Sequence, residues 1–308
     1  MIGCGGRAVD APEIFAVINP VAGGGTGLRA WLSARPVLQA AGRRTVEATA
    51  RAPLEAWRLA ERAAREGFPV VAAVGGDGTV HEVLNGLLRG RPEHPPALAV
   101  IPAGTGNIFA HAFSLPRQPR AAARALVSGA RRRIDVGLAN ERYFASVAGV
   151  GFDGEIVSRA GRWPGWIDGK IRHIAVGLLV LAAYQATPVR VRIDGAERRL
   201  PLFLLAAANT PWYGGGIQIA PHARPDDGAL AVVTITEIGR LEAFRLLARS
   251  FSGRHLGHTR VEHTSAKQVH VDSDIPLRVH ADGEAIGCSP VTFQCVPGAL
   301  ELLIPRGR

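Results

Sequence analysis

Three glycine-rich segments of this 308-residue chain could bind phosphate through their backbone N–H groups. They read NPVAGGGTG at residues 19–27, GGDGT at residues 75–79 and PAGTGN at residues 102–107. Glycine lets backbone amides approach phosphate oxygens closely, and the N-terminus of a following helix adds partial positive charge. One such loop alone is more often an ordinary strand-to-helix turn, but three in one domain favour a nucleotide di- or triphosphate as the ligand.

None of these segments matches the two common glycine signatures of nucleotide-binding proteins. The absence of G-x-x-x-x-G-K-[ST] excludes a P-loop protein, and the absence of G-x-G-x-x-G with an acidic residue about 20 positions later disfavours a dinucleotide fold. Asp77 is the only acid in the loops. Phosphates repel a carboxylate unless Mg²⁺ bridges the charges, so Asp77 is predicted to hold Mg²⁺ or a substrate hydroxyl. The alternative is that it caps the helix that follows.

Two pairs of acidic residues lie in turns late in the chain. Asp282 and Glu284 flank a glycine after a predicted strand, so one carboxylate can accept a proton while the other holds Mg²⁺. An Asp-Gly hairpin turn with a solvated glutamate is the alternative. Asp226 and Asp227 offer the hard oxygen ligands that suit Mg²⁺ or Ca²⁺, or they form a plain turn before Gly228.

The first part of the chain alternates between strands and helices that would position the glycine loops. Strands are predicted at Glu13–Ile18, Arg44–Ala50, Pro69–Val74 and Ala97–Ile101, and helices at Leu28–Ala41, Pro53–Glu66 and Val80–Leu88. This rhythm predicts an α/β domain with a doubly wound parallel sheet and helices on both faces. Because the strand ends of such a sheet line one crevice, the three loops are expected to surround one ligand.

Short strands dominate from Ile134 onward, separated by turn pairs such as Asp194-Gly195. They are predicted at Ile134–Leu138, Tyr143–Val147, Val189–Ile193, Leu202–Ala207, Leu230–Ile235, Val269–Val271, Leu277–Ala281, Val291–Cys295 and Leu300–Ile304, with helices at Gly169–Tyr184 and Arg240–Ser252. The pattern predicts a mainly antiparallel, β-sandwich-like second domain. We place a nucleotide domain at residues 1–132, to which a tail of about residues 299–308 returns, and a β-rich substrate domain at residues 133–298.

Composition narrows the class of protein. Hydrophobic residues make up 47% of the chain, which excludes a disordered protein. The formal net charge of +10 favours anionic partners such as phosphate or an acidic membrane surface. No aromatic platform or basic helix indicates nucleic-acid binding, so no nucleic-acid partner is expected. The ten histidines show no metal-ligand spacing, and no zinc site is predicted.

The chain is expected in the cytoplasm, at most attached to the inner surface of a membrane. Its cysteines, Cys4, Cys288 and Cys295, cannot all pair, which favours a reducing compartment. The first dozen residues hold no apolar core of a signal peptide. The longest apolar run, Ile174–Tyr184, has about half of the roughly 20 residues that a spanning helix needs.

Four segments resemble the diacylglycerol kinase catalytic-domain family, which includes sphingosine kinases and bacterial lipid kinases. VVAAVGGDGTVHEVLNGLL at residues 70–88 resembles the family's nucleotide loop, Asn19-Pro20 with its glycines resembles the first loop, and PAGTGNIFA at residues 102–110 resembles the third. Asp282-Gly283-Glu284, followed by VPGAL at residues 296–300, resembles the C-terminal motif. A similar GGDGT loop occurs in NAD kinases and phosphofructokinases, but the four segments in this order are specific.

The resemblance implies ATP-dependent phosphorylation of a lipid hydroxyl, with Mg²⁺, in the cleft between the two domains. It implies a general base in the motif of Asp282 and Glu284. Family members differ in which of the two carboxylates has this role, and Glu284, helped by Asp282, is favoured here. Asp77 would hold Mg²⁺ or orient the nucleophile. The nucleotide-binding positions that it implies are Asn19, Thr49, Gly75, Gly76, Asp77, Gly78, Thr79, Gly104 and Thr105.

The resemblance also implies a structural Mg²⁺ loop at residues 224–230. Its ligands would be the Asp227 carboxylate and the backbone carbonyls of Arg224 and Ala229. The substrate would be diacylglycerol or another amphiphile that carries a hydroxyl group, and the sequence does not identify which.

The sequence departs from the family at three positions. His81 stands where the family usually has Asn, and Ile108 and His111 stand where many members have Asp and Arg. These departures weaken the expectation of a phosphate clamp in the third loop. Two alternative functions stay open: an NAD-kinase-like phosphotransferase, and a nucleotide-binding protein of the membrane surface that has lost catalysis.

Two segments could contact a lipid. Residues 163–184 combine apolar with basic side chains, so they rest on an anionic membrane, shape an acyl pocket or pack as a core helix. Trp212 and Tyr213, before three glycines, line the cleft or form an aromatic turn. A lipid substrate is the expected partner, and both peripheral membrane contact and a homodimer are compatible with the sequence.

Overall fold

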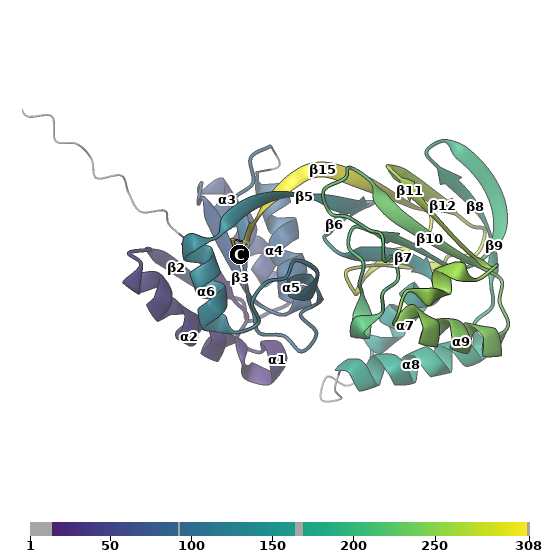
Figure 1. The fold of residues 1–308 in the computed structure, drawn as a ribbon, viewed down its shortest axis with the longest axis horizontal. Helices are drawn as coiled ribbons and strands as arrows, with labels where there is room; N and C mark the ends of the chain where they lie inside the picture. The colour runs from purple at the N-terminus through teal and green to yellow at the C-terminus, as the bar shows by residue number, and fades with distance from the viewer. Residues whose placement is uncertain (1–13, 92, 164–168, 307–308) are drawn as a thin grey trace, which may run out of the picture.

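The computed structural model describes residues 14–91, 93–163 and 169–306, which form two halves joined by two long strands (Figure 1). The joining strands are β5 (Ala130–Ala139) and β15 (Val291–Ile304), which pair antiparallel along most of their length. The first half contains the three glycine loops, and the second contains the turn between Asp282 and Glu284.

The first half is built on a parallel sheet. Its strands are β1 (Ile14–Ile18), β2 (Thr45–Thr49), β3 (Val70–Gly75) and β4 (Ala97–Pro102), in the spatial order β2-β1-β3-β4. Helices α2 (Gly27–Ala40) and α6 (Pro119–Ser128) cover one face, and α3 (Glu55–Arg65) and α4 (Asp77–Gly90) cover the other. Because both faces are covered, every residue of β1, β3 and β4 is buried, which explains their continuous apolar sequences. The predicted doubly wound domain is confirmed.

Two short helices belong to the glycine loops. Helix α1 (Ala22–Gly25) lies within the first loop, and α5 (Ile108–Ala112) follows the third. Each places a turn of backbone at the carboxyl end of the parallel sheet.

The second half is mainly antiparallel, as predicted. Its strands are β6 (Arg142–Phe144), β7 (Val147–Gly151), β8 (Thr187–Ile193), β9 (Ala196–Ala208), β10 (Leu230–Thr236), β11 (Val261–Ala266), β12 (Gln268–Asp272), β13 (Arg278–Ala281) and β14 (Glu284–Cys288). Apolar side chains from facing strands, such as Leu205, Val279 and Phe293, fill a buried core between them. Helices α7 (Phe152–Ala160), α8 (Gly169–Ala183) and α9 (Arg240–Ser250) cover an outer face, at the lower end in Figure 1.

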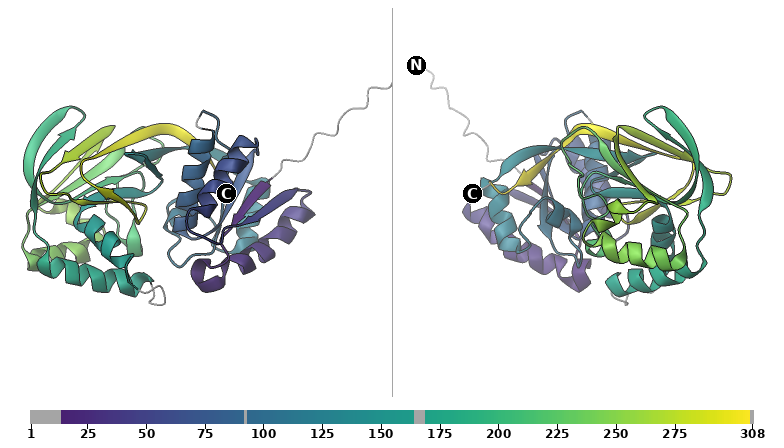
Figure 2. Two further views of the ribbon diagram at one scale, coloured as in Figure 1. Left: turned by 180° about the vertical axis from the view of Figure 1, so that it is seen from behind. Right: turned by 45° about the vertical axis from the view of Figure 1, so that its right-hand side comes forward.

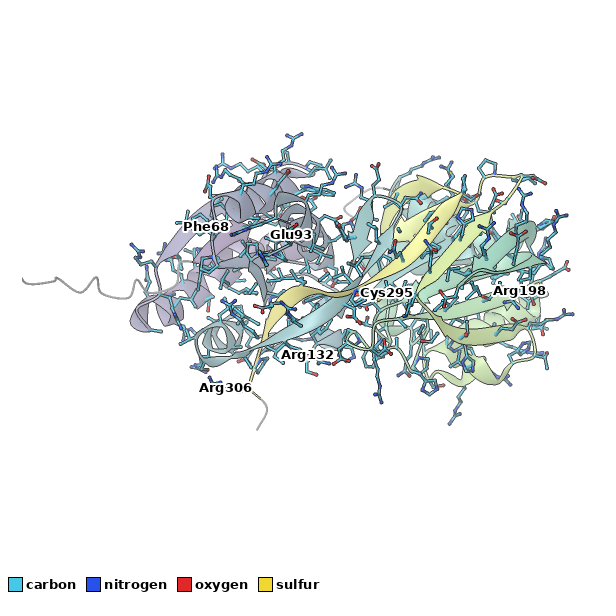
Figure 3. The ribbon with its side chains drawn as sticks, turned by 90° about the horizontal axis from the view of Figure 1, so that it is seen from above. Phe68, Glu93, Arg132, Arg198, Cys295 and Arg306 are labelled. Carbon is cyan, nitrogen blue, oxygen red and sulfur yellow. The ribbon has the colours of Figure 1, made fainter. Side chains whose placement is uncertain are left out.

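Strand β15 connects the two halves by hydrogen bonds. It pairs with β12 of the second half through Val291–Gln294, and Leu302 pairs with Leu98 of β4 in parallel. Figure 2 shows β5 and β15 passing between the halves, and the labelled Arg132 and Cys295 mark these strands in Figure 3. The C-terminal end of β15 therefore lies in the sheet of the first half.

Two strand predictions were wrong in detail. Residues 291–295 and 300–304 belong to one strand, because the β-bulge between Val296 and Leu300 absorbs the Pro-Gly pair that indicates a turn. Gly298 adopts a φ of 57° there, and its N–H group donates to Asp135. The predicted strand over residues 143–147 is divided between β6 and β7, because Ala145 and Ser146 direct their N–H groups to Asp282 instead.

The segment predicted to contact lipid is described in part. Helix α8 confirms the helix expected from Gly169, while Trp166 and Ile167 lie outside the described residues. Val176 and Val180 are buried in a small cluster with α7, so the described part of α8 packs on the core through one side. Within the described part of the chain, no helix is both long enough and apolar enough to cross a membrane.

Candidate active site

The three glycine loops converge at one edge of the parallel sheet. In the strand register Ile18 lies between Thr49 and Val74, so β1, β2 and β3 end side by side. Asn19 Nδ2 in the first loop donates a hydrogen bond to Thr79 Oγ1 in the second, 3.0 Å away. Thr26 Oγ1 donates to the carbonyl of Ala103 in the third loop at 2.9 Å. The predicted meeting of the loops is confirmed, and Thr49 lies at the same edge.

The second and third loops approach so closely that only glycine fits at the contact. A Cβ atom on Gly104 would lie 2.4 Å from Gly76 Cα, closer than real Cβ atoms come to another atom. Asn107 holds the turn of the third loop: its Oδ1 accepts from the Gly104 N–H at 3.0 Å, and its Nδ2 donates to the Gly104 carbonyl at 2.7 Å. Thr105 is thereby left exposed at the tip of the loop.

Asp77 joins the second loop to the third. It is the first residue of α4, but its Oδ1 accepts the N–H of Phe109 at 3.0 Å, so it caps α5 rather than its own helix. Burial raises the pKa of the Asp77 carboxyl, and hydrogen bonds from the N–H groups of Phe109, Ile108 and Asn107 partly oppose this rise. The alternative that Asp77 caps the following helix is therefore wrong, and the predicted role of Asp77 toward Mg²⁺ stays a prediction.

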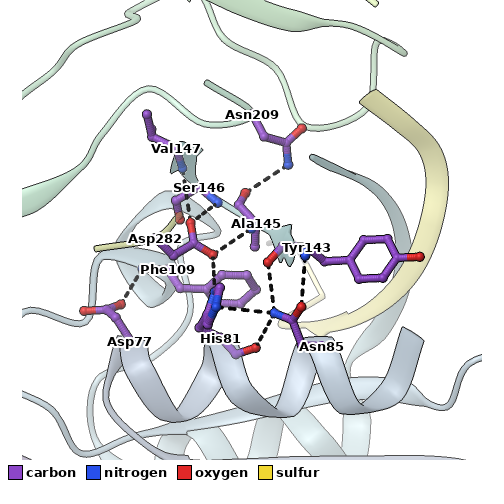
Figure 4. A network of polar contacts seen from close by, with 10 residues as sticks. All are labelled: Asp77, His81, Asn85, Phe109, Tyr143, Ala145, Ser146, Val147, Asn209 and Asp282. Atoms are coloured by element: carbon purple, nitrogen blue, oxygen red, sulfur yellow. Dashed lines mark hydrogen bonds and ion pairs between the residues drawn. The ribbon is translucent and has the colours of Figure 1, made fainter. Parts of the chain in front are cut away.

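Asp282 is held by protein donors at the turn between β13 and β14. Its Oδ1 accepts the N–H groups of Ser146 at 2.8 Å and Val147 at 3.2 Å, and its Oδ2 accepts that of Ala145 at 2.8 Å (Figure 4). His81 Nδ1 lies 3.3 Å from the same Oδ2. The turn is the two-residue Asp-Gly hairpin that the sequence offers as the alternative reading, but its aspartate is nearly buried.

His81 and Asn85 connect α4 of the first half to the second half (Figure 4). Asn85 is fully buried, accepts the N–H of Tyr143 at 2.9 Å and donates to the Tyr143 carbonyl at 2.9 Å. One face of α4 therefore contacts both β6 and the turn that contains Asp282. The motifs of the sequence do not single out Asn85, although a lone amide within the apolar run VLNGLL is a signal of such a buried polar contact.

Glu284, the first residue of β14, reaches across to the second glycine loop. A Cβ atom on Gly78 would lie 3.3 Å from Glu284 Oε1. The residue is exposed, but protein around the end of its side chain desolvates the carboxyl group and raises its pKa. The Glu82 and Asp282 carboxylates raise it further, and His81 opposes the rise. A carboxylate with a raised pKa next to the glycine loops is suited to accept a proton near neutral pH.

The loop implied as a metal site is shaped by protein contacts. Asp227 Oδ1 accepts the N–H of Ala229 at 3.1 Å, and Asp135 Oδ2 accepts the N–H of Gly228 at 2.7 Å. Among the described residues, no group of three or more His, Cys, Asp or Glu is arranged to hold a metal ion. Metal binding by Asp227 with the carbonyls of Arg224 and Ala229 stays a prediction.

The aromatic pair predicted either to line the cleft or to form a turn lies between the two halves. The Trp212 ring contacts the ring of His111 in α5 at a centroid distance of 4.8 Å. Tyr213 stacks on His280 of β13 at 6.1 Å, and His280 Nε2 lies 3.0 Å from a buried Asp153 carboxylate. The loop therefore bridges α5 and the strand that leads to Asp282.

Comparisons with known proteins agree with this arrangement. The sequence-family model of the diacylglycerol kinase catalytic domain matches residues 13–139. The family model of the YegS C-terminal NAD kinase beta sandwich-like domain matches residues 146–304. A diacylglycerol kinase of Mycobacterium tuberculosis (strain ATCC 25618 / H37Rv) is 35% identical over 307 residues, with 97% of each chain covered. A diacylglycerol kinase of Bacillus subtilis (strain 168) is 29% identical over 255 residues, covering 82% of this chain and 83% of its own.

Solved structures show the same fold. A crystal structure of a protein from Bacillus anthracis strain Sterne superposes with a TM-score of 0.81 at 24% identity, covering 98% of each chain. A diacylglycerol kinase from the same strain superposes with a TM-score of 0.73 at 23% identity, covering 97% of this chain and 98% of that one.

An α/β half whose glycine loops face an acidic hairpin from a β-sandwich half, together with these relatives, defines a kinase, that is, a phosphotransferase. The chain belongs to the diacylglycerol kinase catalytic-domain family of lipid kinases, and the resemblance seen in its motifs is confirmed.

Proposed function

We propose that the protein transfers the γ-phosphoryl group of ATP to a hydroxyl of diacylglycerol or a similar lipid, between its two halves. The observation that carries this proposal is the approach of Glu284, from the second half, to Gly78 in the glycine loops of the first. A nucleotide site and a proton acceptor from different halves thus face each other. The names of the relatives support diacylglycerol as the first substrate to test.

The glycine loops would hold the phosphates through backbone N–H groups and the N-terminus of α4. Bound Mg²⁺ would neutralise phosphate charge. Asn19 and Thr26 keep the loops together, and Asp77 fixes the third loop against the second. The proposed nucleotide-contacting residues are Asn19, Thr49, Gly75, Gly76, Asp77, Gly78, Thr79, Gly104 and Thr105.

Glu284 would accept the proton of the lipid hydroxyl as the hydroxyl oxygen attacks the γ-phosphorus. The bond between that phosphorus and the bridging oxygen breaks, and ADP leaves with the electron pair. Asp282 would act by position: the three backbone N–H groups and His81 that hold its carboxylate fix the hairpin that carries Glu284. Its donors leave it less suited to hold Mg²⁺ than the sequence alone indicates.

The test is incubation with Mg-ATP and a lipid panel, followed by mass spectrometry for species that gain one phosphate. We expect phosphorylated lipid with the wild type, a loss of at least about a hundredfold for Glu284→Gln, and full activity for the matched control Glu237→Gln, an exposed site. Unchanged activity of Glu284→Gln would refute its role. NAD, assayed beside the lipids, tests the rival phosphotransferase, and ATP binding without transfer to any acceptor would support a non-catalytic protein.

A further inference from the structure

An exposed apolar stripe runs along helix α9, on the outer side of the second half. Leu241 and Phe244 leave 64% and 53% of their surface open to solvent, and Phe251, directly after the helix, leaves 55%. Leu247 is also exposed. Because these positions are spaced by three or four residues, they share one side of the helix. Exposed apolar patches of this kind mark sites where a protein contacts another protein or a membrane.

Helix α8 extends the apolar surface. It contacts α9, and its Leu178 and Leu179 are exposed as well. Of the large apolar side chains that are strongly exposed in the described chain, half lie on α8, on α9 or directly after it. Ile275, by contrast, is exposed on its own, as single surface residues commonly are.

The charges around the stripe are positive. Arg240, Arg245 and Arg249 of α9 are exposed, and within the part of the chain that the structure describes no ion pair engages them. The one acid of the helix, Glu242, is occupied by His258 at 2.9 Å and by the N–H of Gly239. A helix with exposed apolar side chains and unpaired arginines is the pattern of a segment that lies in the interface of an anionic bilayer.

We propose that the stripe formed by Leu241, Phe244, Leu247 and Phe251, with Arg245 and Arg249 at its edge, docks on an anionic membrane surface. Figures 1 and 2 show α8 and α9 on the side of the molecule opposite β5 and β15. Helix α1 of the first glycine loop lies toward the same side as α8 and α9. Docking there turns the end with the glycine loops toward the bilayer. The membrane contact itself does not depend on the proposed function. Only the inference that the membrane supplies the lipid substrate rests on that function.

The first experiment measures sedimentation of the full chain with vesicles, without nucleotide. Binding is expected to vesicles that contain phosphatidylglycerol, to be weaker with pure phosphatidylcholine, and to fall when NaCl rises from roughly 0.1 M to roughly 0.5 M. In the double variant Phe244→Ser/Phe251→Ser the partition coefficient should fall by about tenfold per side chain. The matched control Leu32→Ser/Ile275→Ser removes two equally exposed side chains elsewhere and should bind as the wild type does.

A second pair of variants tests the charges. Arg245→Glu/Arg249→Glu should weaken binding to the anionic vesicles, while Arg120→Glu/Arg199→Glu, with the same change of net charge at exposed sites elsewhere, should weaken it much less. Equal effects of the two pairs, or equal binding of the serine double variant and its control, would overturn the proposal. If the serine variant instead turns a dimer into a monomer in light scattering with unchanged vesicle binding, the stripe is a dimer interface.

Activity on a soluble short-chain diacylglycerol separates docking from catalysis. The serine variant should keep the wild-type turnover of this substrate while losing activity on vesicle-borne diacylglycerol. Loss of both activities would contradict a role limited to docking. If the wild type phosphorylates neither substrate yet still binds vesicles through the stripe, the proposed function fails and the docking surface stands.

Discussion

Two carboxylates of one hairpin have opposite environments. Asp282 receives three backbone N–H groups and faces His81, so its carboxylate is held in a fixed position. Two residues later, Glu284 lies against the second glycine loop, where desolvation of its carboxyl group and the nearby Glu82 and Asp282 raise its pKa. The hairpin therefore combines a rigid anchor with a group that binds a proton more readily than an ordinary glutamate.

This raised pKa predicts the acid limb of the pH–rate profile. The proposed role of Glu284 as general base requires its ionised form, so kcat/KM should fall with decreasing pH through a pKa above the usual value of about 4.3 for glutamate. Ionised Glu284 is expected to promote activity but to lower stability. A pKa that is raised in the folded state means that the ionised carboxylate lowers the free energy of unfolding at neutral pH. At pH 7, Glu284→Gln should therefore unfold at a higher temperature than the wild type. This difference should disappear as the pH falls below the ordinary pKa of glutamate, about 4.3.

The measurements are a pH–rate profile of the wild type and thermal unfolding of both proteins at several pH values. Glu237→Gln, which alters an exposed glutamate, should change neither. An acid limb at the ordinary glutamate pKa, or a Glu284→Gln variant that is less stable at pH 7, would contradict the electrostatic environment described for this residue.

At the scale of elements, α4 unites the site. Its first turn carries the second glycine loop, its next turn carries His81 against Asp282, and a further turn carries Asn85 against the backbone of Tyr143. Helix α4 thereby fixes the distance between the glycine loops and the hairpin that carries Asp282 and Glu284. No large closure of the halves is needed to bring Glu284 to Gly78.

Replacing Asn85 should loosen this junction. Asn85→Ala leaves the N–H and carbonyl of Tyr143 without their partner in a buried place, at a cost of about 1–3 kcal/mol for each unsatisfied group. We expect a lower free energy of unfolding in urea and a lower kcat, since the hairpin is held through the same helix. The control Gln39→Ala changes an exposed helix residue and should leave both unchanged. Wild-type stability of Asn85→Ala would show that the contact contributes little.

The elements were predictable where local sequence decides them. The apolar runs of β3 and β4 and the glycines that end them predicted the parallel sheet and the meeting of its loops, because burial on both faces leaves a continuous apolar signature. The division between β6 and β7 and the continuity of β15 were not predictable locally. They depend on Asp282 and Asp135, carboxylates far away in the sequence that bind backbone N–H groups at those points.

The same limit applies to the candidate site. The positions of Asp77, Asp282 and Glu284 were indicated by their glycine neighbours, but their partners were not. The cap that Asp77 forms on α5 and the approach of Glu284 to Gly78 join residues that only the folded chain brings together. Residue types show which chemistry is available, and tertiary contacts decide which carboxylate is free to perform it.

At the scale of the whole molecule, the two halves should unfold together. Strand β15 pairs with β12, β5 and β4, so one hydrogen-bonded sheet runs through both halves, and Asp135 ties the β15 bulge and the Gly228 turn to β5. Leu302, fully buried beside β4, belongs to the core of the first half. Leu302→Ala should therefore cost about 2–5 kcal/mol of stability, and in hydrogen exchange β3 and β9 should lose the same amount of protection. Leu32→Ala, at an exposed position of α2, should leave both strands protected, while a loss confined to β3 would show that the halves unfold independently.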